Sequence, residues 1–269
     1  MTPRAEMRRV LQDALDRASR VLRRRFGSVR IRYKGWANLL TQADLESQKA
    51  VLDLIRRRLP RHDYRAEEKA CRDTGSEFVW VIDPLDGTTN FAHGYPVGCV
   101  SIALLQRGRP ILAGIHDPFR GERFLAEAGR GTRLNGRPVC VSSVRRLSQS
   151  LLITGFPYDR NKRPGFYTGF YRSFMVRCHD VRRSGSAALD MAWIAAGRAD
   201  GFWEFHLSPW DVAAGLLLVR EAGGKVSDFT GRPWGRIEDF GRQTLASNGR
   251  IHTAMLREIA RHLPPAKLR

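Results

Sequence analysis

Acidic side chains that could bind a metal ion are concentrated in one short segment of the chain. Residues 83–90 read DPLDGTTN and directly follow the apolar run Phe78–Ile82, which predicts a buried strand. Pro84 fixes its own φ and disfavours helical geometry at Asp83, so Asp83 and Asp86 can face one point. A strand that ends in such a segment delivers polar groups to a sheet edge, where functional sites are common.

The same segment offers groups that could hold a phosphate. Gly87 allows the backbone to approach a ligand closely. The amides of Gly87 and Thr88, at a predicted helix start, could bind an anion. The segment therefore combines metal ligands with a phosphate site.

Further acids lie far away in the sequence, at Glu67-Glu68 and at Asp211. Asp211 begins a predicted helix, where an aspartate is also a routine cap. If these acids converge with residues 83–86, their repulsion raises at least one pKa unless a cation lies among them. Oxygen-only ligands favour Mg²⁺ or Mn²⁺, and two ions about 3.5–4 Å apart would clamp a phosphoester and acidify a water. These residues alone leave the convergence open.

Periodicity predicts the elements that would position these groups. Helices are expected over 4–25, 42–59, 166–177, 186–196, 211–222 and 250–262. Strands with hairpin turns are expected at Val100–Leu105, Ile111–Ile115 and Arg123–Ala126, as an antiparallel meander, and further strands at Leu151–Thr154, Gly201–Glu204, 225–228 and 244–247. The class is α+β in layers. We place a soft boundary near residue 150, between 1–150 and 151–269, within one compact unit.

Composition limits the functional classes. The 269 residues carry a formal net charge of +19, which attracts polyanions. The basic residues are dispersed along the chain, and aromatic residues do not alternate with them as a stacking platform requires, so nucleic-acid binding is not favoured. Four separated cysteines without a CxxC pair indicate a reducing cytoplasm and no zinc site. No apolar run has transmembrane length, so we expect a soluble protein without a membrane role.

Several segments together resemble the inositol monophosphatase family. Residues 80–91 are similar to its first signature, and residues 210–224 to its second. Glu67-Glu68, Asp44, and the segments 185–188 and 200–204 match further pieces of the family in order, between about residues 30 and 250. The resemblance implies a layered α/β/α/β/α phosphatase fold, a homodimer and two to three Mg²⁺ ions.

The resemblance also implies a metal-binding role for individual residues. Glu67, Asp83 and the Leu85 carbonyl would hold the first ion, and Asp83, Asp86 and Asp211 the second. A third, weaker ion would be bound by Glu67 and waters. Ala66 stands where the family usually has glycine, and Asn38 stands where relatives often have an aspartate that helps to complete the third site.

Catalytic and substrate-binding roles follow from the same resemblance. Asp44 and Thr88 would orient or deprotonate the attacking water, with Glu67 contributing through its metal ion. The amides of Gly87 and Thr88 would bind phosphate. Substrate hydroxyls would contact Asp86, Ala187 and Glu204. Three other acids are interpreted as caps or surface charges: Asp190, Glu221 and Asp228.

Fold alone does not determine the substrate. The stretch 88–91 resembles the inositol branch of the family, which makes inositol monophosphate the leading candidate. Fructose 1,6-bisphosphate, histidinol phosphate, NADP and 3′-phosphoadenosine 5′-phosphate remain alternatives. A bisphosphate would need an added basic subsite, which Arg183 or Arg172 could offer. An RNA-binding regulatory protein that retains the fold is the alternative from another class, and the net charge is its support.

Overall fold

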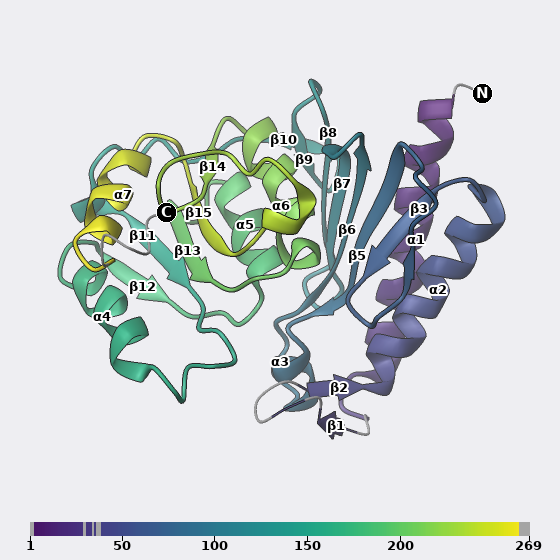
Figure 1. Cartoon of the computed structure of the whole chain (residues 1–269), viewed down its shortest axis with the longest axis horizontal. Coiled ribbons are helices and arrows are strands. Elements are labelled where there is room, and N and C mark those ends of the chain that lie inside the picture. Colours follow the sequence, from purple (N-terminus) through teal and green to yellow (C-terminus); the bar gives the residue numbers. More distant parts are fainter. Residues whose placement is uncertain (1–2, 29–30, 34, 36–38, 264–269) are drawn as a thin grey trace.

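The computed structural model describes residues 3–28, 31–33, 35 and 39–263. Its elements form five layers, helix–sheet–helix–sheet–helix (Figure 1). This arrangement confirms the predicted α+β class. The helices are α1 (Pro3–Arg25), α2 (Gln42–Arg58), α3 (Thr88–Ala92), α4 (Pro164–Met175), α5 (Ala187–Ala195), α6 (Pro209–Glu221) and α7 (His252–Ala260).

Helices α1 and α2 cover the outer face of an eight-stranded sheet, which has the strand order β10-β9-β8-β7-β6-β5-β3-β4 (Figure 1). Its strands are β3 (Asp63–Ala66), β4 (Cys71–Arg72), β5 (Phe78–Asp86), β6 (Cys99–Gln106), β7 (Arg109–Asp117), β8 (Glu122–Glu127), β9 (Thr132–Leu134) and β10 (Arg137–Val139). The strands β5 to β10 form an antiparallel meander, of which β6, β7 and β8 were predicted. The sheet is not wholly antiparallel, however, because β3 pairs with β5 in parallel.

A five-stranded sheet has the order β12-β11-β13-β15-β14. Its strands are β11 (Leu151–Thr154), β12 (Asp180–Arg182), β13 (Gly201–Phe205), β14 (Lys225–Ser227) and β15 (Gln243–Ser247). The strands β12, β11 and β13 are mutually parallel, so their carboxyl ends meet at one edge. Helices α4 and α7 cover its outer face (Figure 1). A short hairpin, β1 (Ile31–Tyr33) with β2 (Leu39–Thr41), precedes α2.

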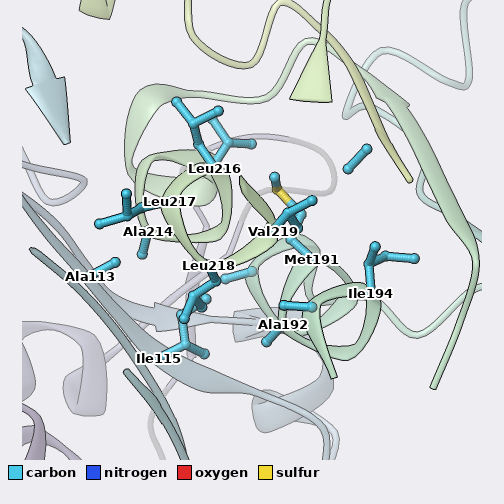
Figure 2. Packing of buried hydrophobic residues seen from close by; sticks show 14 of the residues in the cluster. Ala113, Ile115, Met191, Ala192, Ile194, Ala214, Leu216, Leu217, Leu218 and Val219 are labelled. Atoms are coloured by element: carbon cyan, nitrogen blue, oxygen red, sulfur yellow. The ribbon is translucent and has the colours of Figure 1, made fainter. Parts of the chain in front are cut away.

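The two central helices, α5 and α6, fill the space between the sheets. Figure 2 shows α6 side chains such as Leu218 packed between Ile115 of β7 and Ala192 of α5. These side chains are fully or almost fully buried. This continuous apolar contact fixes α6 relative to both sheets, and therefore fixes the position of the first residues of α6.

Most predicted helices and strands are present within one or two residues of their expected ends. The prediction missed β1 to β4, β9, β10 and β12, which are all four residues or shorter. The stretch before Glu67, for which the sequence analysis predicts no element, is strand β3. Strand β5 also continues through Asp86, with a register shift between Asp83 and Asp86 in its pairing with β6. In the described part of the chain, no helix is both long and apolar enough to cross a membrane.

Candidate active site

Carboxylates from distant parts of the sequence meet at one point. Asp83 and Asp86 at the end of β5, and Asp211 in the first turn of α6, each place an oxygen within 4.8 Å of the others. Glu67 follows β3, and its amide donates to the Ile82 carbonyl at 3.1 Å, beside the end of β5. All four acids line a cavity of about 840 Å³. We call Glu67, Asp83, Asp86 and Asp211 the acidic cluster.

The acidic cluster is electrostatically unfavourable without a cation. Burial raises the pKa of Asp83 well above its usual value, and the charges of Glu67, Asp86 and Asp211 raise it further. Burial and the charges of Asp86 and Glu67 likewise raise the pKa of Asp211. Burial raises the pKa of Asp86 to about 6, although hydrogen bonds to its carboxylate oppose this shift. The donors are hard oxygens, so the cluster fits Mg²⁺.

Asp211 serves two purposes at once. Its Oδ2 accepts a hydrogen bond from the Ser208 amide at 2.7 Å and completes a capping box at the start of α6. Its carboxylate also lines the cavity and belongs to the acidic cluster. The ordinary capping role and the metal-binding role are therefore compatible.

Asp44 and Thr88 form a buried hydrogen-bonded pair beside the acidic cluster. Thr88 Oγ1 lies 3.0 Å from Asp44 Oδ1 and 3.0 Å from the Leu85 carbonyl oxygen, and can donate to either. Asp44 Oδ2 accepts from the amide and the hydroxyl of Thr41 at 2.7 and 2.6 Å. Burial raises the pKa of Asp44. This fixed carboxylate can accept a proton that passes through the hydroxyl of Thr88.

The turn before α3 needs a glycine. Gly87 has φ 95°, and a Cβ there would lie 2.9 Å from the Val97 carbonyl oxygen. Asn90 donates from Nδ2 to the carbonyls of Val97 and Ser184, at 3.0 and 2.9 Å, and ties this turn to the segment before α5. The Gly87 and Thr88 backbone therefore lies on the cavity wall next to the acidic cluster.

Glu204 and Ala187 line the same cavity. Glu204 lies near the end of β13 and is 8% exposed. Burial raises its pKa to about 8. Within the described residues its carboxyl group has no hydrogen-bond partner, although it faces the cavity. A buried, unpartnered carboxyl group in a cavity is suited to bind ligand hydroxyls.

Sequence reasoning missed several residues of the site. Ser186 Oγ and the Ala188 amide both donate to Asp86 Oδ2, at 2.7 Å each, and so orient that ligand. Tyr158 lines the cavity, and its exposed ring lies near the acidic cluster. Asp190, interpreted as a cap or surface charge, is buried and lines the cavity, so that interpretation was wrong. The sequence signal that could have identified Ser186 is its position in the segment 185–188, which resembles a segment of the family.

The two departures from the family pattern have different outcomes. Ala66 is buried in β3 and is not among the positions with positive φ, so its methyl group causes no backbone strain. Asn38 lies outside the described residues, and so does Lys34 in the same loop. The third metal site therefore stays a prediction.

Comparisons with known proteins agree with this fold. The sequence model described as "Inositol monophosphatase family" matches residues 4–264. Inositol-1-monophosphatase from Synechocystis sp. PCC 6803 is 45% identical over 235 residues, covering 86% of this chain and 80% of that protein. Nus factor SuhB from Escherichia coli K12 is 43% identical over 234 residues, covering 87% and 86%. The structure of inositol monophosphatase from Anabaena sp. PCC 7120 matches with a TM-score of 0.86 at 42% identity, covering 99% and 100%.

The layered α+β fold, the cavity lined by clustered carboxylates and these relatives define this chain as a phosphatase. The chain belongs to the inositol monophosphatase family. The family resemblance noted in the sequence is thereby confirmed.

Proposed function

We propose that this phosphatase hydrolyses the phosphomonoester of a small polyol in the presence of Mg²⁺, with inositol monophosphate as the leading substrate. One observation carries the proposal. The acidic cluster, the Asp44–Thr88 pair and the unpartnered carboxyl group of Glu204 all surround one cavity or lie directly behind its wall. Metal ligands, a proton acceptor and a hydroxyl-binding group are thus within reach of one small substrate.

The acidic cluster would hold two Mg²⁺ ions, with the Leu85 carbonyl as a further ligand; Mn²⁺ could substitute. When bound, these ions supply Lewis acidity and lower the pKa of a coordinated water. Asp44, oriented by Thr41, accepts the proton of the attacking water through the Thr88 hydroxyl. The water oxygen forms the new P–O bond as the bond to the polyol oxygen breaks, and the departing polyol oxygen takes a proton from a water molecule in the cavity.

The remaining cavity residues hold the substrate. The Gly87 and Thr88 amides bind phosphate oxygens at the first turn of α3. Glu204 and Asp86 accept hydrogen bonds from the hydroxyl groups of the polyol, and Ala187 contacts its carbon skeleton. A ring with several hydroxyl groups would therefore bind better than an aryl group, which has none.

A panel of phosphomonoesters assayed with Mg²⁺ and after exhaustive chelation tests this proposal. Inositol 1-phosphate should be hydrolysed only with the metal. Glu204→Ala should reduce kcat/KM for inositol 1-phosphate by about 10- to 100-fold, because a buried hydroxyl left without its hydrogen-bond partner costs about 1–3 kcal/mol. Hydrolysis of 4-nitrophenyl phosphate should change much less. Equal losses on both substrates would give Glu204 a structural role instead.

A second function, as a Nus factor, is supported by the relatives named Nus factor SuhB and by the net charge of +19. It would require RNA or protein binding at a surface separate from the cavity. RNA affinity measured between 50 and 200 mM salt tests this, because phosphate contacts give a steep salt dependence. The homodimer also remains a proposal, and light scattering of the purified protein tests it.

A further inference from the structure

Asp190 is a buried acid beside the active-site cavity that the proposed mechanism does not use. It lies in the first turn of α5, is 1% exposed and lines the cavity, but it is not a member of the acidic cluster. Its Oδ1 accepts a hydrogen bond from Ser184 Oγ at 2.5 Å, and no other group in the described part of the chain donates to its carboxyl group. A carboxyl group with so few partners is costly to bury, so its role is expected in the one contact that it makes.

The hydroxyl of Ser184 holds a tight turn between β12 and α5. Besides donating to Asp190, it accepts a hydrogen bond from the Ser186 amide at 3.3 Å. The Ser184 carbonyl accepts a hydrogen bond from Asn90 Nδ2 at 2.9 Å. Gly185, between the two serines, has φ 89°, a conformation that favours glycine. The turn 184–186 is therefore fixed from two sides, by Asp190 of α5 and by Asn90 of α3.

The same turn carries Ser186, which contacts a proposed metal ligand. Ser186 Oγ donates to Asp86 Oδ2 at 2.7 Å, and the Ala188 amide donates to the same oxygen at 2.7 Å. A carboxylate oxygen has two lone pairs, so these two donors occupy Oδ2 and fix the direction of the carboxylate plane. The way in which Asp86 faces the other acids thus depends on the position of Ser186.

Helix α5 is a rigid base for this chain of contacts. Helices α5 and α6 lie side by side (Figure 2). They approach so closely that a Cβ at Gly215 of α6 would lie 2.6 Å from Met191 Cβ of α5. Helix α6 carries Asp211 in its first turn. Asp190 therefore connects the turn 184–186 to the same pair of helices that places another acid of the cluster.

We propose that Asp190 is a positioning residue that sets the Mg²⁺ affinity of the acidic cluster. It fixes Ser184, the turn 184–186 places the hydroxyl of Ser186, and that hydroxyl orients Asp86. The inference rests on the proposed function, in which Asp86 is a ligand of Mg²⁺. Replacing a residue that supports a metal ligand through hydrogen bonds weakens metal binding by about 10- to 100-fold. Asp190 acts through two serines, so we expect the lower end of this range.

Titration of the metal-free protein with MgCl₂, followed by calorimetry and by thermal unfolding, measures the Mg²⁺ dissociation constant without substrate. Asp190→Ala should raise this constant by about 10-fold. Asp190→Asn should recover most of the loss, because an amide oxygen still accepts the hydrogen bond from Ser184. Ser184→Ala should raise the constant to a similar extent. Combining Asp190→Ala with Ser184→Ala should raise it no further, because both residues act through one contact.

Asp200→Ala is the matched control. Asp200 is 5% exposed and accepts hydrogen bonds from the Ser142 hydroxyl and the Leu151 amide, but it does not line the cavity. Its replacement should lower the stability of the protein and leave the Mg²⁺ dissociation constant unchanged.

An unchanged dissociation constant in Asp190→Ala would overturn the inference, and so would additive effects of the two substitutions. If Asp190→Ala does not fold, Ser184→Ala decides, because an unchanged constant in that variant overturns the inference as well. When the wild type binds Mg²⁺ and the variants bind it equally well, only this inference fails. A wild type that binds no Mg²⁺ would contradict the proposed function itself.

Discussion

Replacing Asp83 with asparagine separates the metal-binding role of this residue from its role in folding. The substitution removes one negative charge and keeps the shape of the side chain. Asp83 Oδ1 accepts a hydrogen bond from the Leu85 amide at 2.9 Å, and an asparagine oxygen can accept the same bond. The side chain is almost completely buried, so its neighbours feel the change in charge with little screening from water.

The expected change in stability follows from the distances in the acidic cluster. Two carboxylates whose oxygens lie within 4.8 Å of one another repel by about 3 kcal/mol or more at an effective dielectric constant near 20. Burial and repulsion raise the pKa values of Asp83, Asp86 and Asp211, which reduces the charge present without metal. Asp83→Asn should therefore stabilise the metal-free protein by a part of this repulsion, about 1–2 kcal/mol.

Magnesium should stabilise the wild type much more than Asp83→Asn. At 100 times its dissociation constant, a ligand that binds only the folded state adds about 2.7 kcal/mol to the stability of the wild type. Asp83→Asn should lose most of this gain, because asparagine is a weaker ligand, and should lose phosphatase activity as well. Thermal unfolding of both proteins, with Mg²⁺ and with a chelator, measures both effects.

Asp63→Asn provides a matched control. Asp63 is equally buried but lies outside the cavity, and its carboxylate accepts hydrogen bonds from Thr74 and Ser76. Its replacement should destabilise the protein and leave the magnesium response intact. An unchanged magnesium response in Asp83→Asn would refute the assignment of Asp83 to the metal site, and with it the main argument for the mechanism.

Two further experiments test the substrate end of the cavity and the C-terminal helix. Gly155→Ala should displace the carboxyl group of Glu204 and reduce kcat/KM for inositol 1-phosphate by about 10-fold or more, whereas Gly169→Ala, where a Cβ meets nothing within 4 Å, should not affect turnover. His252 is buried between the hydroxyls of Ser227 and Ser247, and burial lowers its pKa to about 4. Because this folded-state pKa is below the unfolded value of about 6.5, stability should be lost as pH falls from about 6.5 to 4, by about 3 kcal/mol in total. Urea unfolding should show a shallower pH dependence for His252→Asn, and identical pH dependences for variant and wild type would contradict this assignment.

Local sequence patterns determined most of the helices and strands. The apolar stripe of α1 and the buried stripe of α2 follow the helical period, and the hairpins around β7 follow their turn residues. The short strands were not predictable, because a segment of two to four residues such as β4 has no measurable period. Strand β3 depends on pairing with β5, a contact between segments that are separate in the sequence.

The residue types of the candidate site were likewise predictable from the sequence. Residues 83–90 contain two proposed metal ligands, the proposed phosphate-binding turn and Thr88 within one local segment, so their spacing alone indicates the chemistry that we propose. The family resemblance added Asp44, Glu67, Glu204 and Asp211. The structure places all of these around one cavity, or directly behind its wall in the case of Asp44.

Only the tertiary structure decided which distant groups meet. Asp211 reaches Asp83 because α6 is packed between the two sheets, and Arg183 comes near Glu204 because β12 and β13 flank β11 in one parallel arrangement. The burial of Asp190 follows from the same packing. Local helix and strand propensities contain no information about such neighbours, because the burial of apolar faces across the whole chain determines which residues come together. The pKa values and the ligand contacts of these groups depend in turn on how deeply the fold buries them.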